Sequence, residues 1–163
     1  IISNIKSGSK RRFFYYLQIF IYCHLQRIIS GDKMNKFSEF LIVFGIGSFL
    51  YGFIEVMFRG FTHWSMFLTG GIIFYLLYTL FYMIGSGNIL LKCLMGCAAI
   101  TTVEFLVGCI VNIAFKMNVW DYSQEKYNLF GQICLSFSIG WFFISIPAYY
   151  LTAALHRGFT HKT

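Results

Sequence analysis

Charged side chains are scarce in this sequence: Asp, Glu, Lys and Arg together make up 12% of its 163 residues, and only six are acidic. Proline is rarer still, because Pro147 is the only one. A chain with so few charges and 58% apolar residues has too little polar surface to coat a water-soluble globule. The composition therefore excludes the ordinary soluble classes and favours a protein that dissolves in lipid.

Sequence motifs for ATP hydrolysis and zinc binding are absent as well. The chain lacks a Gly-x-x-x-x-Gly-Lys-Ser/Thr loop, so it does not bind and hydrolyse ATP by that route. It has five cysteines, but Cys93 and Cys97, one helical turn apart, have no His or further Cys at zinc-ligand spacing. We interpret the thiols as apolar filler and expect neither a metal nor another cofactor.

What the sequence has instead is four long apolar stretches, at residues 37–58, 66–84, 92–115 and 129–155. Each reaches the ~20 residues that a helix needs to cross ~30 Å of hydrocarbon. We predict an all-α, polytopic membrane protein, in which one domain over residues 34–163 holds four transmembrane helices. The lipid bilayer is its first expected partner.

Residues 1–33 form an N-terminal extension with concentrated positive charge. The net charge of the chain is +7, and six of its 13 basic residues precede Met34. Because the remainder carries only a small excess of charge, no basic face is left to bind phosphates, and we expect no nucleic-acid partner. Met34 followed by an apolar helix resembles a natural start. We therefore interpret residues 1–33 as an upstream extension, with an additional interfacial helix at Phe13–Ile29.

Basic residues near the predicted spans indicate the orientation in the membrane. If both termini are cytoplasmic, five basic residues lie on the inner side: Lys33, Lys36, Lys92, Arg157 and Lys162. Three lie on the outer side, Arg59, Lys116 and Lys126, and two acids partly offset them. We predict a multi-pass protein of the cell membrane with cytoplasmic termini. An outer aromatic belt is predicted from Trp64, Trp120, Tyr122 and Tyr127.

The first predicted span carries small and polar residues at intervals of three and four, which places them on one helix face. They are Gly45, Ser48, Gly52, Glu55 and Arg59. The small residues predict a groove that lets a neighbouring helix approach closely. Glu55 must face protein or water, because a carboxylate in hydrocarbon costs a few kcal/mol. Its pairing with Arg59 is either a structural ion pair or part of a functional site.

The third span repeats this pattern with Cys93, Cys97, Thr101, Glu104, Gly108 and Asn112. Glu104 falls near the middle of the helix, where an acid is most expensive to bury. It is either a functional carboxylate, in ionised or protonated form, or a structural group that hydrogen-bonds to Ser48, Thr101 or Ser136.

The fourth span begins with Asn128, Gln132, Ser136 and Gly140, each four residues after the last. On a helix these side chains line the cavity that Glu104 and Glu55 face. We list as candidates for a substrate or ion pathway Glu55, Arg59, Glu104, Asn112, Asn128, Gln132 and Ser136. The second span, rich in Phe and Tyr, is predicted to be mostly a scaffold that faces lipid.

An outer loop with the sequence Trp120-Asp121-Tyr122-Ser123 joins the third and fourth spans. The carboxylate of Asp121 suits an ordered turn, since it can accept hydrogen bonds from backbone N–H groups. Capping of that turn and contact with a ligand are the two roles open to Asp121.

Several of these segments together resemble a known family of bacterial membrane proteins. They are Gly52-Phe53-Ile54-Glu55-Val56, Arg59-Gly60-Phe61, Val103-Glu104-Phe105 with Gly108, Trp120-Asp121-Tyr122-Ser123, Asn128-Leu129-Phe130-Gly131-Gln132-Ile133-Cys134 and Trp141. The resemblance, over about Met34–Tyr150, is to the family named Putative ABC-transporter type IV, or CmpB-like permeases. It implies a permease component that works with a separate ATPase subunit. Thr62-His63-Trp64-Ser65 departs from the proline-containing loop of many members.

Three functions are compatible with the sequence. The first is a permease-like component for a small solute, in which Glu55 and Glu104 bind a cation, a proton or a basic group. Four helices make a small pore, so a homo-oligomer or a partner is expected. The second is a membrane-interface enzyme that uses Glu55, Glu104, His63 and Asp121 as acid, base or ligand. The third is a structural, regulatory or phage-associated membrane protein without transport activity. An enzyme is the less favoured alternative.

Overall fold

The computed structural model describes residues 35–85 and 87–160, which form four long helices and a small hairpin. The helices are α2 (Lys36–Arg59), α3 (Trp64–Ile84), α4 (Ile89–Gly108) and α5 (Leu135–Thr160), and α4 continues into the π-helix η1 (Cys109–Ala114). Two short antiparallel strands, β1 (Asn128–Leu129) and β2 (Ile133–Cys134), precede α5. All four helices are long and apolar enough to span a membrane. The all-α polytopic prediction is confirmed, while the Phe13–Ile29 helix lies outside the described residues.

Local capping explains where the first helices begin and end. Asn35 and Asn88 each accept a hydrogen bond from the backbone N–H two residues later, at the starts of α2 and α4. Gly60 ends α2 at a φ of 77°, a left-handed conformation that glycine adopts without steric penalty. The four residues 60–63 connect α2 to Trp64 at the start of α3.

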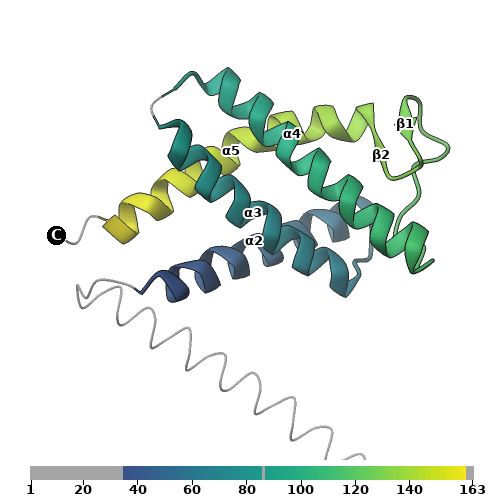
Figure 1. Cartoon of the computed structure of the whole chain (residues 1–163), viewed down its shortest axis with the longest axis horizontal. Helices are drawn as coiled ribbons and strands as arrows, with labels where there is room; N and C mark the ends of the chain where they lie inside the picture. The colour runs from purple at the N-terminus through teal and green to yellow at the C-terminus, as the bar shows by residue number, and fades with distance from the viewer. Residues whose placement is uncertain (1–34, 86, 161–163) are drawn as a thin grey trace, which may run out of the picture.

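The helices run up and down, so the described ends of the chain lie at one end of the molecule. Figure 1 shows the start of α2, the α3–α4 turn and the end of α5 at that end, and the hairpin at the other. Helix α2 packs chiefly on α3, and α4 on α5, while α3 also contacts α4 and α5. Backbone contacts between α2 and α5 are few. The fold is therefore two helix pairs joined through α3.

Glycines allow the closest approach within the α2–α3 pair. A Cβ added at Gly47 would lie 2.7 Å from the carbonyl oxygen of Gly70, and one at Gly70 would lie 2.8 Å from that of Gly47. The predicted groove is confirmed at Gly52, where an added Cβ would meet the ring of Phe67. It is wrong for Gly45, which has no atom within 4 Å of an added Cβ. The contact face of α2 is thus rotated toward Gly47.

The prediction that the second span mostly faces lipid is wrong. In the most apolar 18-residue segment of α3, 44% of the residues are buried, the largest share among the four helices. Ile73, Phe74, Leu77, Tyr78 and Phe81 are all buried. The physical reason is that α3 contacts all three other helices, so aromatic side chains fill the space between the two pairs. Apolar composition alone does not distinguish a face that meets lipid from one that meets protein.

The fourth helix begins later than the sequence predicted. Residues 128–134 form the β1–β2 hairpin, and α5 starts at Leu135. Left-handed conformations at Tyr127, Phe130 and Gly131, with φ between 53° and 66°, form the turn and cannot continue into a helix. The polar residues Asn128, Gln132 and Ser136 recur every four positions as on a helix, but the backbone of residues 128–134 is not helical. Pro147 lies inside α5.

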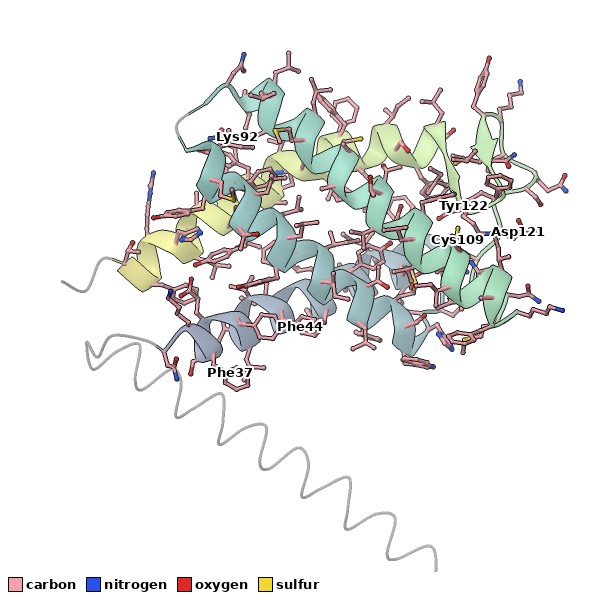
Figure 2. The ribbon with its side chains drawn as sticks, viewed as in Figure 1. Phe37, Phe44, Lys92, Cys109, Asp121 and Tyr122 are labelled. Atoms are coloured by element: carbon pink, nitrogen blue, oxygen red, sulfur yellow. The ribbon has the colours of Figure 1, made fainter. Side chains whose placement is uncertain are left out.

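The end of the bundle that holds the α3–α4 turn contains a buried lysine and a polar cluster around Tyr78. Lys92 is only 1% exposed, and its ammonium lies 3.9 Å from the centre of the Tyr149 ring. Figure 2 shows Lys92 at the opposite end from Asp121 and Tyr122. Nearby, Tyr78 donates a hydrogen bond to Glu39, and His156 stacks on Tyr78. Lys92 therefore lies at the predicted end of the bundle but packs inside it, because an aromatic face accommodates the cation.

Candidate functional site

Glu104 is the most deeply buried acid in the described part of the chain, with 5% of its surface exposed. Tyr51 of α2 donates a hydrogen bond to Oε1, and Trp141 of α5 donates one to Oε2 at 2.6 Å. A phenol and an indole are suitable partners because each has an apolar body and one polar hydrogen. The carboxylate of α4 thus joins both helix pairs.

Glu55 has a different environment near the hairpin end of the bundle. Its Oε1 forms an ion pair with Nη1 of Arg59 at 2.6 Å, and its Oε2 accepts a hydrogen bond from Thr62 at 2.6 Å. Nη2 of Arg59 donates to the carbonyl oxygen of Val119, in the loop between η1 and β1. The pair therefore offsets its own charge and ties α2 to the loop.

The two acids share a pocket of about 220 Å³ between α2, α4 and α5, which we call the outer pocket because it lies at the hairpin end of the bundle. Its lining includes Tyr51, Ile54, Glu55, Phe58, Arg59, Met66, Glu104, Trp120, Tyr122, Ser136, Phe137, Gly140, Trp141 and Ile144. An inner pocket of about 260 Å³ shares Tyr51, Ile54, Trp141 and Ile144 with it. Among the described residues, none that lines this inner pocket carries a charge. Both pockets lie between α2 and α5, whose backbones come close at few positions.

The rings of Tyr51 and Trp141 lie where the two pockets meet. Their centres are 5.6 Å apart and their planes differ by 22°, so the rings stack across the space between α2 and α5. Both rings line both pockets, and both donate to Glu104. The position of this ring pair is therefore coupled to the hydrogen bonds that Glu104 accepts.

Charge in the outer pocket is not balanced by its own residues. Its lining holds two carboxylates and one guanidinium, and that guanidinium pairs with Glu55. Within residues 35–85 and 87–160, Glu104 has no cationic side chain at ion-pair distance. An ionised Glu104 thus leaves an excess negative charge in an aromatic pocket.

Three predicted pathway residues lie outside the outer pocket and stabilise the loop. Asn112 donates to Oε1 of Gln132 at 2.8 Å and accepts from the backbone N–H of Val119 at 2.7 Å. Asn128 hydrogen-bonds to the backbone at Ser123, Glu125 and Gly131. Ser136 does line the pocket, along with Glu55, Arg59 and Glu104. The structure thus divides the predicted set into pocket residues and loop residues.

The Trp120–Ser123 segment covers the outer pocket. Asp121 accepts from the backbone N–H of Ser123 at 2.8 Å and from its hydroxyl at 3.0 Å, which is the capping role among the two left open. Trp120 is buried and donates to the carbonyl oxygen of Gln132, so it packs inside the protein instead of contributing to the predicted outer aromatic belt. Its indole N–H donates to a buried carbonyl inside the protein, so it does not require a hydrogen-bond partner at the membrane–water interface. Burial raises the pKa of the Tyr122 hydroxyl well above its ordinary value.

The four residues proposed for enzyme chemistry do not lie together in one site. Nδ1 of His63 accepts from the backbone N–H of Ser65 at the start of α3, and Asp121 is exposed in its turn. Neither residue lines the pocket that holds Glu55 and Glu104. In the described ranges, no three His, Cys, Asp or Glu side chains gather as metal ligands.

Sequence reasoning missed the partners of Glu104. It proposed serine and threonine hydroxyls, whereas the structure uses Tyr51 and Trp141. Tyr51 lies one helical turn before Glu55, on the polar face of α2, and that spacing was the available signal. Trp141 had no such signal, because its contact with Glu104 depends on how α4 and α5 pack.

This fold and pocket define a class: a multi-pass membrane protein whose described residues form four long helices, with a buried acid beneath the loop that precedes the hairpin. The chain belongs to the family described as Putative ABC-transporter type IV, whose family model matches residues 21–163. The match extends over all four helices, and the resemblance seen in the sequence is confirmed. It makes the chain a transporter-related membrane protein. No solved structure matches the chain significantly.

Proposed function

We propose that this chain is the permease component of a transporter for a small solute, and that a separate ATPase subunit supplies the energy. One observation carries the proposal: two pockets lie on either side of a stacked ring pair, and both rings hold the buried Glu104. Ionisable residues inside the membrane commonly mark solute or ion pathways. Family membership supports the link to an ATPase.

In this proposal, the Tyr51–Trp141 ring pair is the gate between the pockets. A solute that enters the outer pocket competes with both rings for Glu104. When the carboxylate turns to the solute, the phenol and the indole lose their shared acceptor, and the rings are free to separate. The inner pocket then becomes continuous with the outer one. Glu104 would thus couple solute binding to opening.

The proposal includes an orientation in the cell membrane. With cytoplasmic termini, the hairpin end faces outward, and the outer pocket opens on that side. The α3–α4 turn is short, between Ile84 and Ile89, and offers little surface to an ATPase. A homo-oligomer or a partner subunit would therefore complete both the pathway and the cytoplasmic contact.

The gate can be tested without knowing the solute. Ala148 lines the inner pocket, so Ala148→Cys reports access to it. We expect a membrane-impermeant maleimide, added from outside, to label Ala148→Cys slowly. Labelling should accelerate severalfold in Glu104→Gln, because the glutamine NH2 replaces one of the two acceptor oxygens and one ring loses the acceptor of its hydrogen bond. Trp141→Phe, which keeps a ring but cannot donate, should have the same effect.

Gly158→Cys is the matched control. It lies on the same helix near its far end, and an added Cβ there meets no atom within 4 Å. It should resist outside reagent in every background. Unchanged labelling of Ala148→Cys in both variants, with normal helix content and elution volume, would rule out the gate.

A further inference from the structure

The outer pocket is lined largely by aromatic side chains, and the chain's membership of its family does not explain this lining. Six aromatic side chains surround it: Tyr51, Phe58, Trp120, Tyr122, Phe137 and Trp141. They come from α2, α5 and the outer loop, so folding brings together rings that are up to 90 positions apart. The faces of aromatic rings attract cations, and they do so most strongly where water is excluded.

The charged side chains that line the outer pocket favour a cationic ligand. Arg59 is occupied by Glu55 and by the carbonyl of Val119, whereas Glu104 has hydrogen-bond donors but no described cation. An anionic ligand would meet excess negative charge beside Glu104. A cation would meet a carboxylate and several ring faces.

The chemistry of the lining favours an organic cation over a metal ion. Calcium and magnesium ions require about six oxygen ligands or more, and many of these are carboxylates or carbonyls. The outer pocket offers the carboxylates of Glu55 and Glu104, and Glu55 already holds Arg59. Rings and aliphatic side chains cannot replace lost water around a metal ion. They can contact the methyl or methylene groups of an ammonium ion.

The inner pocket adds a preference for an apolar chain. Its lining includes Leu50, Ile73, Leu77, Pro147 and Leu151, together with the shared ring pair. An alkyl group attached to an ammonium head in the outer pocket would reach this space between Tyr51 and Trp141. The outer pocket, at about 220 Å³, is smaller than the ~300–1,000 Å³ usual for drug-sized ligands.

We propose that the outer pocket binds the head of an alkylammonium ion, with Glu104 as its counter-ion, and that the alkyl chain extends past the ring pair into the inner pocket. This inference rests on the proposed function in taking the pocket as the solute site. It adds the chemical class of that solute.

The probe for this proposal is octyltrimethylammonium, measured by calorimetry on the full chain in lipid nanodiscs. Empty nanodiscs correct for partition into lipid. We expect saturable binding that weakens about tenfold or more in Glu104→Gln, because the glutamine removes the negative charge that pairs with the ammonium head. Tetramethylammonium should bind more weakly because it lacks the chain. Octyl sulfate should show partition only.

A second variant keeps the test valid if Glu104→Gln folds poorly. Gly140 lines the outer pocket, and a Cβ there meets no atom within 4 Å, so Gly140→Leu should occupy the space without a backbone clash. It should weaken binding by about tenfold as well. Gly45→Leu is its control, because Gly45 is equally open but lies outside both pockets.

The outcomes separate the two proposals. Equal binding of octyl sulfate, or unchanged affinity in folded Glu104→Gln and Gly140→Leu, would overturn the ammonium proposal and leave the gate intact. Binding as predicted, with no effect of Glu104→Gln or Trp141→Phe on Ala148→Cys labelling, would instead contradict the proposed transport function.

Discussion

At the residue scale, buried polar groups in the half of the bundle nearest the hairpin are held by specific partners. Glu104, Gln132 and Asn112 are all buried, and each forms hydrogen bonds. In a membrane this pairing matters, because no solvent replaces a lost partner. Asn112 is the clearest case, since its single side-chain amide connects η1 both to the loop at Val119 and to the hairpin turn at Gln132.

Replacement of Asn112 should therefore destabilise the outer loop. Asn112→Ala leaves the buried N–H of Val119 without its acceptor, which costs about 1–3 kcal/mol. We expect a lower midpoint of thermal unfolding in detergent, followed by tryptophan fluorescence. Gln124→Ala removes an exposed amide from the same loop and should leave the midpoint unchanged. Equal midpoints for both variants would show that the Asn112 contacts do not support the loop.

At the element scale, the apolar stretches predicted the helices well, because hydrocarbon thickness fixes the length of a span. Glu104 could also be found, since an acid inside such a stretch is expensive. The β1–β2 hairpin could not, because polar residues at 128, 132 and 136 repeat with helical spacing while left-handed residues break the helix. The packing of α3 against the other three helices could not be predicted either, because apolar side chains suit contact with lipid and contact with protein equally well.

The α2–α3 pair makes a prediction that compares two glycines of one helix. Gly47→Ala would place a methyl group against Gly70 and Phe74, where the gap is too small, and should lower the free energy of unfolding by about 1–3 kcal/mol. Gly45→Ala meets open space and should be neutral or slightly stabilising. Unfolding in denaturing detergent measures both. If Gly47→Ala matched Gly45→Ala, the close approach of α2 and α3 would be wrong.

At the scale of the whole molecule, the arrangement in two helix pairs creates the site. Because α3 joins the pairs and the backbones of α2 and α5 come close at few positions, space remains between them for both pockets. The Tyr51–Trp141 ring pair crosses that space, and Glu104 of α4 holds both rings. The ion-paired Glu55, by contrast, fixes the outer loop to α2 through Arg59. The two acids thus have distinct contacts, and in the proposed function Glu104 is the group that meets a ligand.

The infrared difference spectrum on addition of octyltrimethylammonium tests this assignment most directly. A carboxylate that gains a cation and loses two hydrogen bonds changes its stretching bands. The account predicts a carboxylate difference signal in the parent protein and in Glu55→Gln, and its loss in Glu104→Gln. A signal that persists in Glu104→Gln, or one that disappears only in Glu55→Gln, would contradict the central role of Glu104.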